Sequence, residues 1–429
     1  MGDALISHQG GHAKEEVSWI LYDVGNSAFV LVMITAVMPI FFKDVAAAGL
    51  PDVVSTAYWG FANAGASVIL ALLSPILGAM ADYQDKKRTL FLWFLGAGLF
   101  FTIALMGIHQ GMWLLCLLFF VLSRVGWAGA NLFYDAFLVD VTTRERMDLV
   151  SSRGYAWGYI GSVAPFLFIL WRITAAGDIA GGLPLAPTRM GFLVVAVWWL
   201  LFSLPLVKTV QQKHALPPSA RPIRESFHRL WQTFQRIRTH QPVFMFLGAY
   251  FFYIDGVGTI ISMSTAYGRD LGFSVTLLIV VILFIQVIAF PFALLYGKLA
   301  QRFSSKTMLM SGIVVYCLIT LMAFMLPEIQ DTELKVGMFW CIAFLVASSM
   351  GGIQALSRSL FARLIPMEQS GEFFGFFNVF GKFAAIAGPL LMGGIAKISG
   401  HTRWGVLSLL VLFLAGLFFL NKVKEPDIP

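Results

Sequence analysis

Ionisable side chains interrupt several long apolar runs of this sequence, where they are energetically costly. Asp23, Arg124, Asp255 and Lys382 each lie within a stretch of mainly apolar residues. A charge in the hydrocarbon interior of a bilayer costs about 2.5–3.5 kcal/mol on insertion scales, so such residues typically line a watery cavity, an ion pathway or a binding site. We therefore treat these four residues as candidates for substrate binding or reversible protonation.

Polar neighbours at helical spacing extend each candidate. Asn131 and Asp135 follow Arg124 at +7 and +11, on one stripe of a helix. One interpretation is a cavity-lining cation that binds a carboxylate or adjusts a proton site, and the alternative is an Arg124–acid pair with a structural role. A carboxyl such as Asp255 in a partly dry cavity suits reversible protonation, whereas Asp23 lies nearer a run's end and could cap or gate. The candidate binding and coupling residues are Tyr22, Asp23, Asn26, Arg124, Asn131, Asp135, Tyr253, Asp255, Gln354, Arg358, Asn378 and Lys382.

Several of the charged residues lie near the ends of the runs, where structural roles compete. Salt bridges at a gate are favoured over substrate contact for the residues near the cytoplasmic ends, which are Asp135, Asp140, Arg144 and Glu372. Arg358 and Arg363 could simply meet lipid headgroups. Lys382 lies too deep to reach the interface easily, which favours contact with a substrate or an acid.

The apolar runs predict the elements that must position these residues. Of the 429 residues, 58% are hydrophobic and 12% are charged, whereas soluble domains carry about 25% charged residues. A helix needs about 20 apolar residues to cross a bilayer. The sequence therefore predicts an all-α membrane protein with twelve spans, near 19–42, 55–80, 89–109, 112–140, 154–174, 189–207, 243–265, 273–296, 307–327, 336–361, 373–396 and 403–421.

The basic residues predict the orientation of these spans. Most Lys and Arg fall in segments that lie inside if the N-terminus is inside, which by the positive-inside rule places both termini in the cytoplasm. The net charge of +7 therefore reflects orientation and indicates no nucleic-acid partner. We expect a multi-pass protein of a bacterial inner (plasma) membrane.

A central loop over 208–242 divides the chain into predicted six-span halves, 1–207 and 243–429. Its start, residues 211–221, is Pro-rich and polar and predicts a flexible linker. Residues 224–240 predict a basic amphipathic helix, which could lie on the inner leaflet or pack on the protein's own cytoplasmic face.

The two halves repeat one plan. Gly78 and Asp82 close the second run and a basic cluster follows, while Gly297 and Lys306 hold matching places after the eighth run. This pattern resembles the signature between spans two and three of the major facilitator superfamily, whose two six-helix bundles are pseudo-symmetric. Asp82 could accept from amides at a helix N-terminus and the cations could bind carboxylates, which would stabilise one access state. Gln84-Asp85 stands where the signature usually has a glycine, so we expect a different turn. The candidate gating residues are Gly78, Asp82, Lys86, Lys87, Arg88 and Gly297.

Three longer motifs narrow the resemblance. Residues 19–29 (WILYDVGNSAF), 351–366 (GGIQALSRSLFARLIP) and 372–382 (EFFGFFNVFGK) resemble hallmarks of the UMF1 family, which includes the fungal vacuolar Atg22-like effluxers. The resemblance implies a major facilitator fold, and in its fungal members amino-acid export from the vacuole. Asp255 stands where the family usually carries an Asn-Asp pair, with Ile254 in place of the first residue.

These observations predict a secondary transporter with alternating access, no enzymatic activity and no cofactor or metal. No phosphate-cradling G-x-x-x-x-G-K-[ST] loop is present, so ATP-driven transport is not indicated. We expect a monomer that exports amino acids or similar small polar metabolites, with protons as the coupling ion. Alternatives are an efflux pump for drug-like amphipathic compounds, a channel, or a non-transporting membrane receptor on the same scaffold.

Overall fold

The computed structural model describes residues 2–177, 183–218, 222–235 and 241–425. Within these ranges the chain is helical, apart from short turns and one isolated bridge between Tyr83 and Leu216. The helices are α1 (Gly2–Phe29), α2 (Val37–Phe41), α3 (Asp52–Ala81), α4 (Lys86–Ala104), α5 (Trp113–Ala136), α6 (Leu138–Val141), α7 (Met147–Ala175), α8 (Leu185–Thr209), α9 (Pro222–Gln235), α10 (Gln241–Asp270), α11 (Val275–Phe303), α12 (Ser305–Met325), α13 (Thr332–Leu364), α14 (Ser370–Ser399) and α15 (Thr402–Asn421).

Twelve helical segments of the described chain are long and apolar enough to cross a membrane, which confirms the predicted number of spans. Because twelve is even, both termini lie on the same side of the membrane, which we call the terminal side. The first span is irregular: π-helical segments over Val30–Ala36 and Phe42–Ala46 flank the short helix α2. Pro39 lies in α2 and has no backbone N–H, so regular helical bonding cannot continue through it.

The chain forms two compact units. Unit 1 comprises residues 1–142, 157–227 and 367–375, and unit 2 comprises residues 143–156, 228–366 and 376–429. The first residues of α7 therefore belong to unit 2, and the first residues of α14 belong to unit 1. The predicted division into halves at 208–242 stays a prediction about the organisation of the chain.

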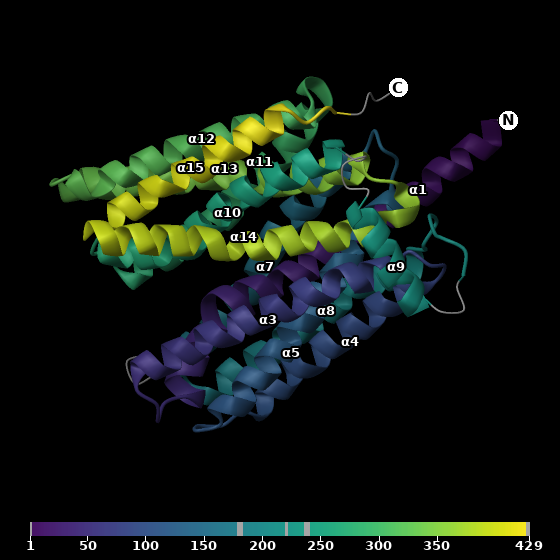
Figure 1. Cartoon of the computed structure of the whole chain (residues 1–429). Helices are drawn as coiled ribbons and strands as arrows, with labels where there is room; N and C mark the ends of the chain where they lie inside the picture. The colour runs from purple at the N-terminus through teal and green to yellow at the C-terminus, as the bar shows by residue number, and fades with distance from the viewer. Residues whose placement is uncertain (1, 178–182, 219–221, 236–240, 426–429) are drawn as a thin grey trace. The chain divides into compact units, whose positions relative to one another are not determined.

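Helix packing follows the same order in each unit (Figure 1). In unit 1, α5 packs on α3 and α4, and α1 packs on α8. In unit 2, α13 packs on α11 and α12, and α10 packs on α15. Small residues allow the closest approach, since a Cβ at Gly126 of α5 would lie 2.4 Å from the backbone nitrogen of Gly98 of α4. The repeated pairing matches the internal repeat of the sequence.

The start of the central loop is an ordered strap, so the predicted flexible linker is wrong for residues 212–216. Leu216 donates its amide to the carbonyl of Asp82 (2.8 Å) and accepts from the amide of Gln84 (3.1 Å). The Gln212 side chain donates to the carbonyl of Ala81 (2.9 Å). These bonds satisfy carbonyls that the end of α3 leaves without helical partners, which is why a polar, Pro-rich segment is held here. The remainder of the predicted linker and the end of the predicted 224–240 helix, at 219–221 and 236–240, lie outside the described residues.

The turn that lacks the usual glycine is built on a left-handed residue. Asp85 has φ of 63°, directly before α4, and its side chain makes no cap hydrogen bond. Ser304 has φ of 79° at the matching turn before α12, and its side chain accepts from the Thr307 amide. Both residues take a conformation that favours glycine, but Ser304 also caps its helix.

We expect Asp85→Gly to raise the free energy of unfolding by about 1 kcal/mol, because glycine adopts the left-handed conformation without the Cβ clash. Thermal unfolding of the detergent-solubilised protein measures the change. Asp85→Ala is the matched control, since it removes the carboxylate but keeps the Cβ in the left-handed conformation, and it should bring no such gain. Equal gains in both variants would contradict this account.

Candidate functional site

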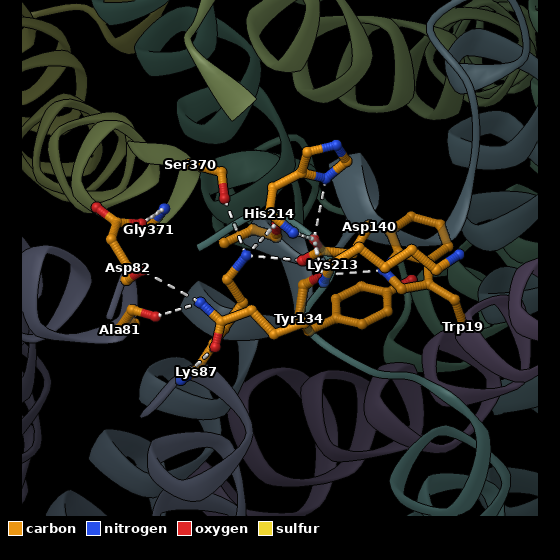
Figure 2. Close-up of polar contacts among 12 residues, drawn as sticks. Trp19, Ala81, Asp82, Lys87, Tyr134, Asp140, Lys213, His214, Ser370 and Gly371 are labelled. Carbon is orange, nitrogen blue, oxygen red and sulfur yellow. Dashed lines mark hydrogen bonds and ion pairs between the residues drawn. The ribbon is translucent and has the colours of Figure 1, made fainter. Parts of the chain in front are cut away.

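Asp82 fastens the end of α3 to the beginning of α14 (Figure 2). Its Oδ1 accepts from the amide of Gly371 at 2.7 Å and its Oδ2 from the amide of Glu372 at 3.1 Å. These are the expected bonds to a helix N-terminus, where amides lack helical partners and the dipole favours an anion. Gly78 makes the approach possible, since a Cβ there would lie 2.1 Å from the carbonyl oxygen of Gly371.

Lys87 forms a fully buried ion pair beside this contact (Figure 2). Its Nζ donates to Oδ2 of Asp140 at 2.7 Å, to Oγ of Ser370 at 2.9 Å and to the carbonyl of Ala136 at 3.3 Å. The three ammonium donors are thus all used, which offsets the cost of burying the charge. The contacts of Asp82 and Lys87 with the start of α14 are called the α14 clasp below.

The strap of the central loop binds the other oxygen of Asp140. The backbone amides of Lys213 and His214 donate to Oδ1 at 3.0 and 2.9 Å, and Nδ1 of His214 lies 3.2 Å from the same oxygen. Asp140 therefore connects the end of the fourth span to the α14 clasp and to the strap. This confirms the expectation that Asp140 serves a salt bridge rather than substrate contact.

A second clasp, at the start of α7, lies within unit 2. Asp148 accepts from the hydroxyls of Ser305 (2.7 Å) and Ser359, and forms a 2.9 Å ion pair with Arg363. Gly297 of α11 permits the contact, because a Cβ there would lie 2.6 Å from Cβ of Ser152. This α7 clasp joins the fifth span to the eighth, ninth and tenth. The α14 clasp joins the eleventh span to the second, third and fourth in the same manner.

The suggestion that Arg358 and Arg363 meet lipid headgroups is wrong, because both are buried, at 2% and 5% exposure. Arg358 donates to Oγ and to the carbonyl of Ser151, at 3.0 and 3.1 Å, and its guanidinium lies 4.4 Å from the centre of the Tyr155 ring. Neighbouring helices cover these positions, which helical spacing alone does not show. Of the other basic gating candidates, Lys86 is exposed, and Arg88 donates to the carbonyl of Val207 at 2.8 Å.

The first and fourth spans share a buried polar network in unit 1. Tyr134 donates to Oδ2 of Asp23 at 2.7 Å, and the Asn26 amide donates to Oδ1 of Asp23 at 3.4 Å. Asn26 in turn accepts from Trp127 and, at 2.9 Å, from Asn131. The structure thus brings together three of the predicted residues, Asp23, Asn26 and Asn131. Tyr134 and Asn26 provide the hydrogen-bond donors to the Asp23 carboxylate.

The remaining candidates of unit 1 lie around this network. Tyr22 is fully buried against the rings of Tyr134 and Phe91. Asp135 is half-buried. Arg124 is also half-buried and donates to Asn63 of the second span.

Asp255 in unit 2 is fully buried, and its surroundings differ from those of Asp23. No side chain of the described part of the chain hydrogen-bonds to either of its carboxylate oxygens, and no cation there pairs with it. The hydroxyl of Thr259, one turn later, is also buried without a hydrogen-bond partner. Both face Gly388 of α14, where a Cβ would lie 2.1 Å from Oγ1 of Thr259 and 2.7 Å from Oδ1 of Asp255.

The other candidates of unit 2 are placed as follows. Tyr253 is fully buried, and its hydroxyl lies 2.6 Å from Oγ of Ser357 on α13. Gln354, Asn378 and Lys382 are half-buried on α13 and α14.

Sequence reasoning missed several polar residues that the structure connects to the candidates. Tyr134, Trp127 and Asn63 belong to the networks of unit 1, and Asp148 is the centre of the α7 clasp. For Asp148 a signal was available, since it begins the fifth span at the place where Ser370 begins the eleventh.

Comparison with known structures defines the class of this fold. The chain superposes on the proton:xylose symporter XylE with a TM-score of 0.70 and 13% identity, over 96% of this chain and 95% of that one. It superposes on the human organic anion transporter MFSD10 with a TM-score of 0.68 and 14% identity, over 96% and 98%. These superpositions show that the chain has the fold of the major facilitator transporters.

The family follows from the sequence comparison. Residues 52–426 match the model of the Atg22-like vacuole effluxers, and the chain belongs to that family. It is 48% identical to the MFS-type transporter YxiO of Bacillus subtilis (strain 168), over 96% of this chain and 95% of that protein. It is 25% identical to autophagy-related protein 22 of Yarrowia lipolytica, over 64% of this chain and half of that protein's length. The resemblance inferred from the three motifs is confirmed.

Proposed function

We propose that this transporter exports amino acids or similar small polar metabolites by alternating access, with protons as the coupling ion and Asp255 as the group that carries them. The family is described as vacuole effluxers, which supports movement of a small solute across the membrane. A bacterial inner membrane with both termini in the cytoplasm remains the proposed setting, and the monomer the proposed form.

The observation that carries this proposal is the isolation of Asp255. A carboxylate that is buried without a cation or hydrogen-bond donors is neutralised by taking up a proton. Asp255 has neither kind of side-chain partner within the described residues, and we propose that it carries a proton in this conformation. Contact with water in another access state would allow the proton to leave, and that difference between states is what coupling requires.

Asp23 and Arg124 suit the binding of a zwitterionic or carboxylate-bearing solute. Asp23 and Asn26 form a network that positions acceptors, and Arg124 presents a cation that is only half-buried. An amino acid has an ammonium group for the acceptors of Asp23 and Asn26 and a carboxylate for Arg124. We propose Arg124 as the contact of the substrate carboxylate.

The two clasps suit the stabilisation of one access state. Both lie at span ends on the terminal side of the membrane, and both join a helix start to spans of the other predicted half. We propose that they hold the terminal side closed and separate when it opens.

Counterflow in proteoliposomes tests the proposed function. Liposomes loaded with unlabelled amino acids should accumulate the labelled form, because a carrier exchanges the two, whereas a receptor does not. An imposed pH gradient should then drive net transport. Exchange of amphipathic drugs without exchange of amino acids would favour the alternative efflux function.

The space beside Gly388 gives a sharper test of the Asp255 region. We expect Gly388→Ala to reduce proton-driven transport strongly, because the added methyl group would lie against Oγ1 of Thr259 and Oδ1 of Asp255. Overpacking of this kind typically also costs about 1–3 kcal/mol of stability. Gly394→Ala is the matched control on the same helix, since nothing lies within 4 Å of a Cβ there. Equal transport by the two variants would remove Gly388 from the coupling region.

A further inference from the structure

Helix α9 of the central loop exposes its aromatic face. Phe227 and Trp231 are 53% and 61% exposed, one turn apart. Arg224 and His228 are exposed on the same stripe. A solvated helix that packs on its own protein places such aromatic side chains inward. α9 does the opposite, which excludes packing of this face on the described protein as the explanation for its amphipathic pattern.

The covered side of α9 is correspondingly polar. Ser226 is fully buried, and Arg229 and Thr233 are half-buried together with Leu230. The helix therefore turns hydroxyls and a guanidinium inward and two large rings outward. Large aromatic rings that are more than half exposed on a helix favour an apolar surrounding such as the upper part of a bilayer.

The attachments of α9 place it beside the ends of membrane spans. The Tyr83 hydroxyl donates to Glu225 at 3.3 Å, so the first turn of α9 lies beside the end of the span that closes at Ala81. The chain leaves the preceding span at Thr209 and enters the next at Gln241. These points place the first turn of α9 beside the end of a membrane span on the terminal side.

We propose that the exposed face of α9, formed by Arg224, Phe227, His228 and Trp231, lies in the headgroup layer of the terminal side and binds anionic phospholipid. Trp and Phe at this depth bury their rings among the upper acyl chains. Arg224 supplies the cation that a lipid phosphate requires. A protein partner on this face is the rival that the experiment must distinguish.

Spin-label accessibility of the full-length protein tests the proposal. His228→Cys carries the label on the exposed face, in a background where Cys116, Cys317 and Cys341 are replaced by alanine, and Thr233→Cys carries it on the covered side. The protein is reconstituted in phosphatidylcholine vesicles with phosphatidylglycerol. We expect the label at 228 to collide more with oxygen and less with a water-soluble nickel complex than a label in water. A label at 228 that is open to nickel would place the face in water and overturn the proposal, and so would one immobilised and shielded from both reagents.

Lipid binding itself is measured by native mass spectrometry of the detergent-purified protein with added phosphatidylglycerol. We expect Phe227→Ser/Trp231→Ser and Arg224→Gln to lose bound phosphatidylglycerol, whereas Thr233→Ala, on the covered side, retains it. Unchanged lipid occupancy in the first two variants would overturn the proposal. Each variant is also checked by thermal unfolding, so that loss of fold is recognised separately from loss of lipid.

Discussion

Asp255→Asn is expected to abolish transport driven by a pH gradient while leaving exchange of labelled for unlabelled substrate largely intact. Asparagine has the shape of the protonated carboxyl but cannot release a proton, so the variant should pass between access states only in the proton-loaded form. Because no side chain of the described chain hydrogen-bonds to Asp255, the substitution removes no such bond and the variant should fold normally. Net flux should fall to that of protein-free liposomes.

Asp270→Asn is the matched control for this experiment, because Asp270 lies exposed at the end of the same helix. It makes the identical chemical change without touching the buried position. Its net flux and exchange should equal those of the unmodified protein. pH-driven transport that survives in Asp255→Asn would assign the coupling role to another group. Loss of exchange as well would instead indicate a role in substrate binding.

The largest effect on stability is expected from Lys87→Met. Removal of one partner from a buried ion pair leaves the other charge uncompensated and typically costs about 3–5 kcal/mol. The strap amides of Lys213 and His214 still donate to Asp140, so the loss should fall toward the lower end of this range. Thermal unfolding in detergent measures the loss, and the transition should move to a clearly lower temperature.

Lys86→Met is the control, since Lys86 is the exposed neighbour and should tolerate the same change. The double variant Lys87→Met/Asp140→Asn removes both charges and should recover part of the stability. If Lys87→Met unfolds at the same temperature as Lys86→Met, the buried pair does not hold the α14 clasp together.

Much of the fold could be predicted from the sequence, for a physical reason. A bilayer demands a long apolar stretch for each crossing, so the twelve spans are visible in composition alone. The bonds of Asp82 were predictable too, because a helix N-terminus has free amides and a carboxylate at the end of a span can accept hydrogen bonds from them. The first residues of α7 belong to unit 2 and those of α14 to unit 1. No local sequence pattern indicates this arrangement.

The candidate site was harder to predict because its contacts join distant segments. Helical spacing placed Asn131 on a stripe, but it could not show that Tyr134, which lies off that stripe, would reach Asp23. It could not show that other helices would cover Arg363 and pair it with Asp148. The strap was missed because a Pro-rich, polar stretch has no hydrophobic pattern, although its backbone amides bind Asp140.

The α14 clasp has a consequence for how the protein is made. Asp82 and the amide of Gly371 are separated by 289 residues, so the second, third and fourth spans are synthesised long before their partner exists. Until the eleventh span enters the membrane, the Asp82 carboxylate lacks its two amide donors and Lys87 lacks Ser370, although the Lys87–Asp140 ion pair can already form. Unit 1 is therefore complete only after residues 367–375 have been made, and a chain that stalls before residue 370 would leave the Asp82 carboxylate without these donors.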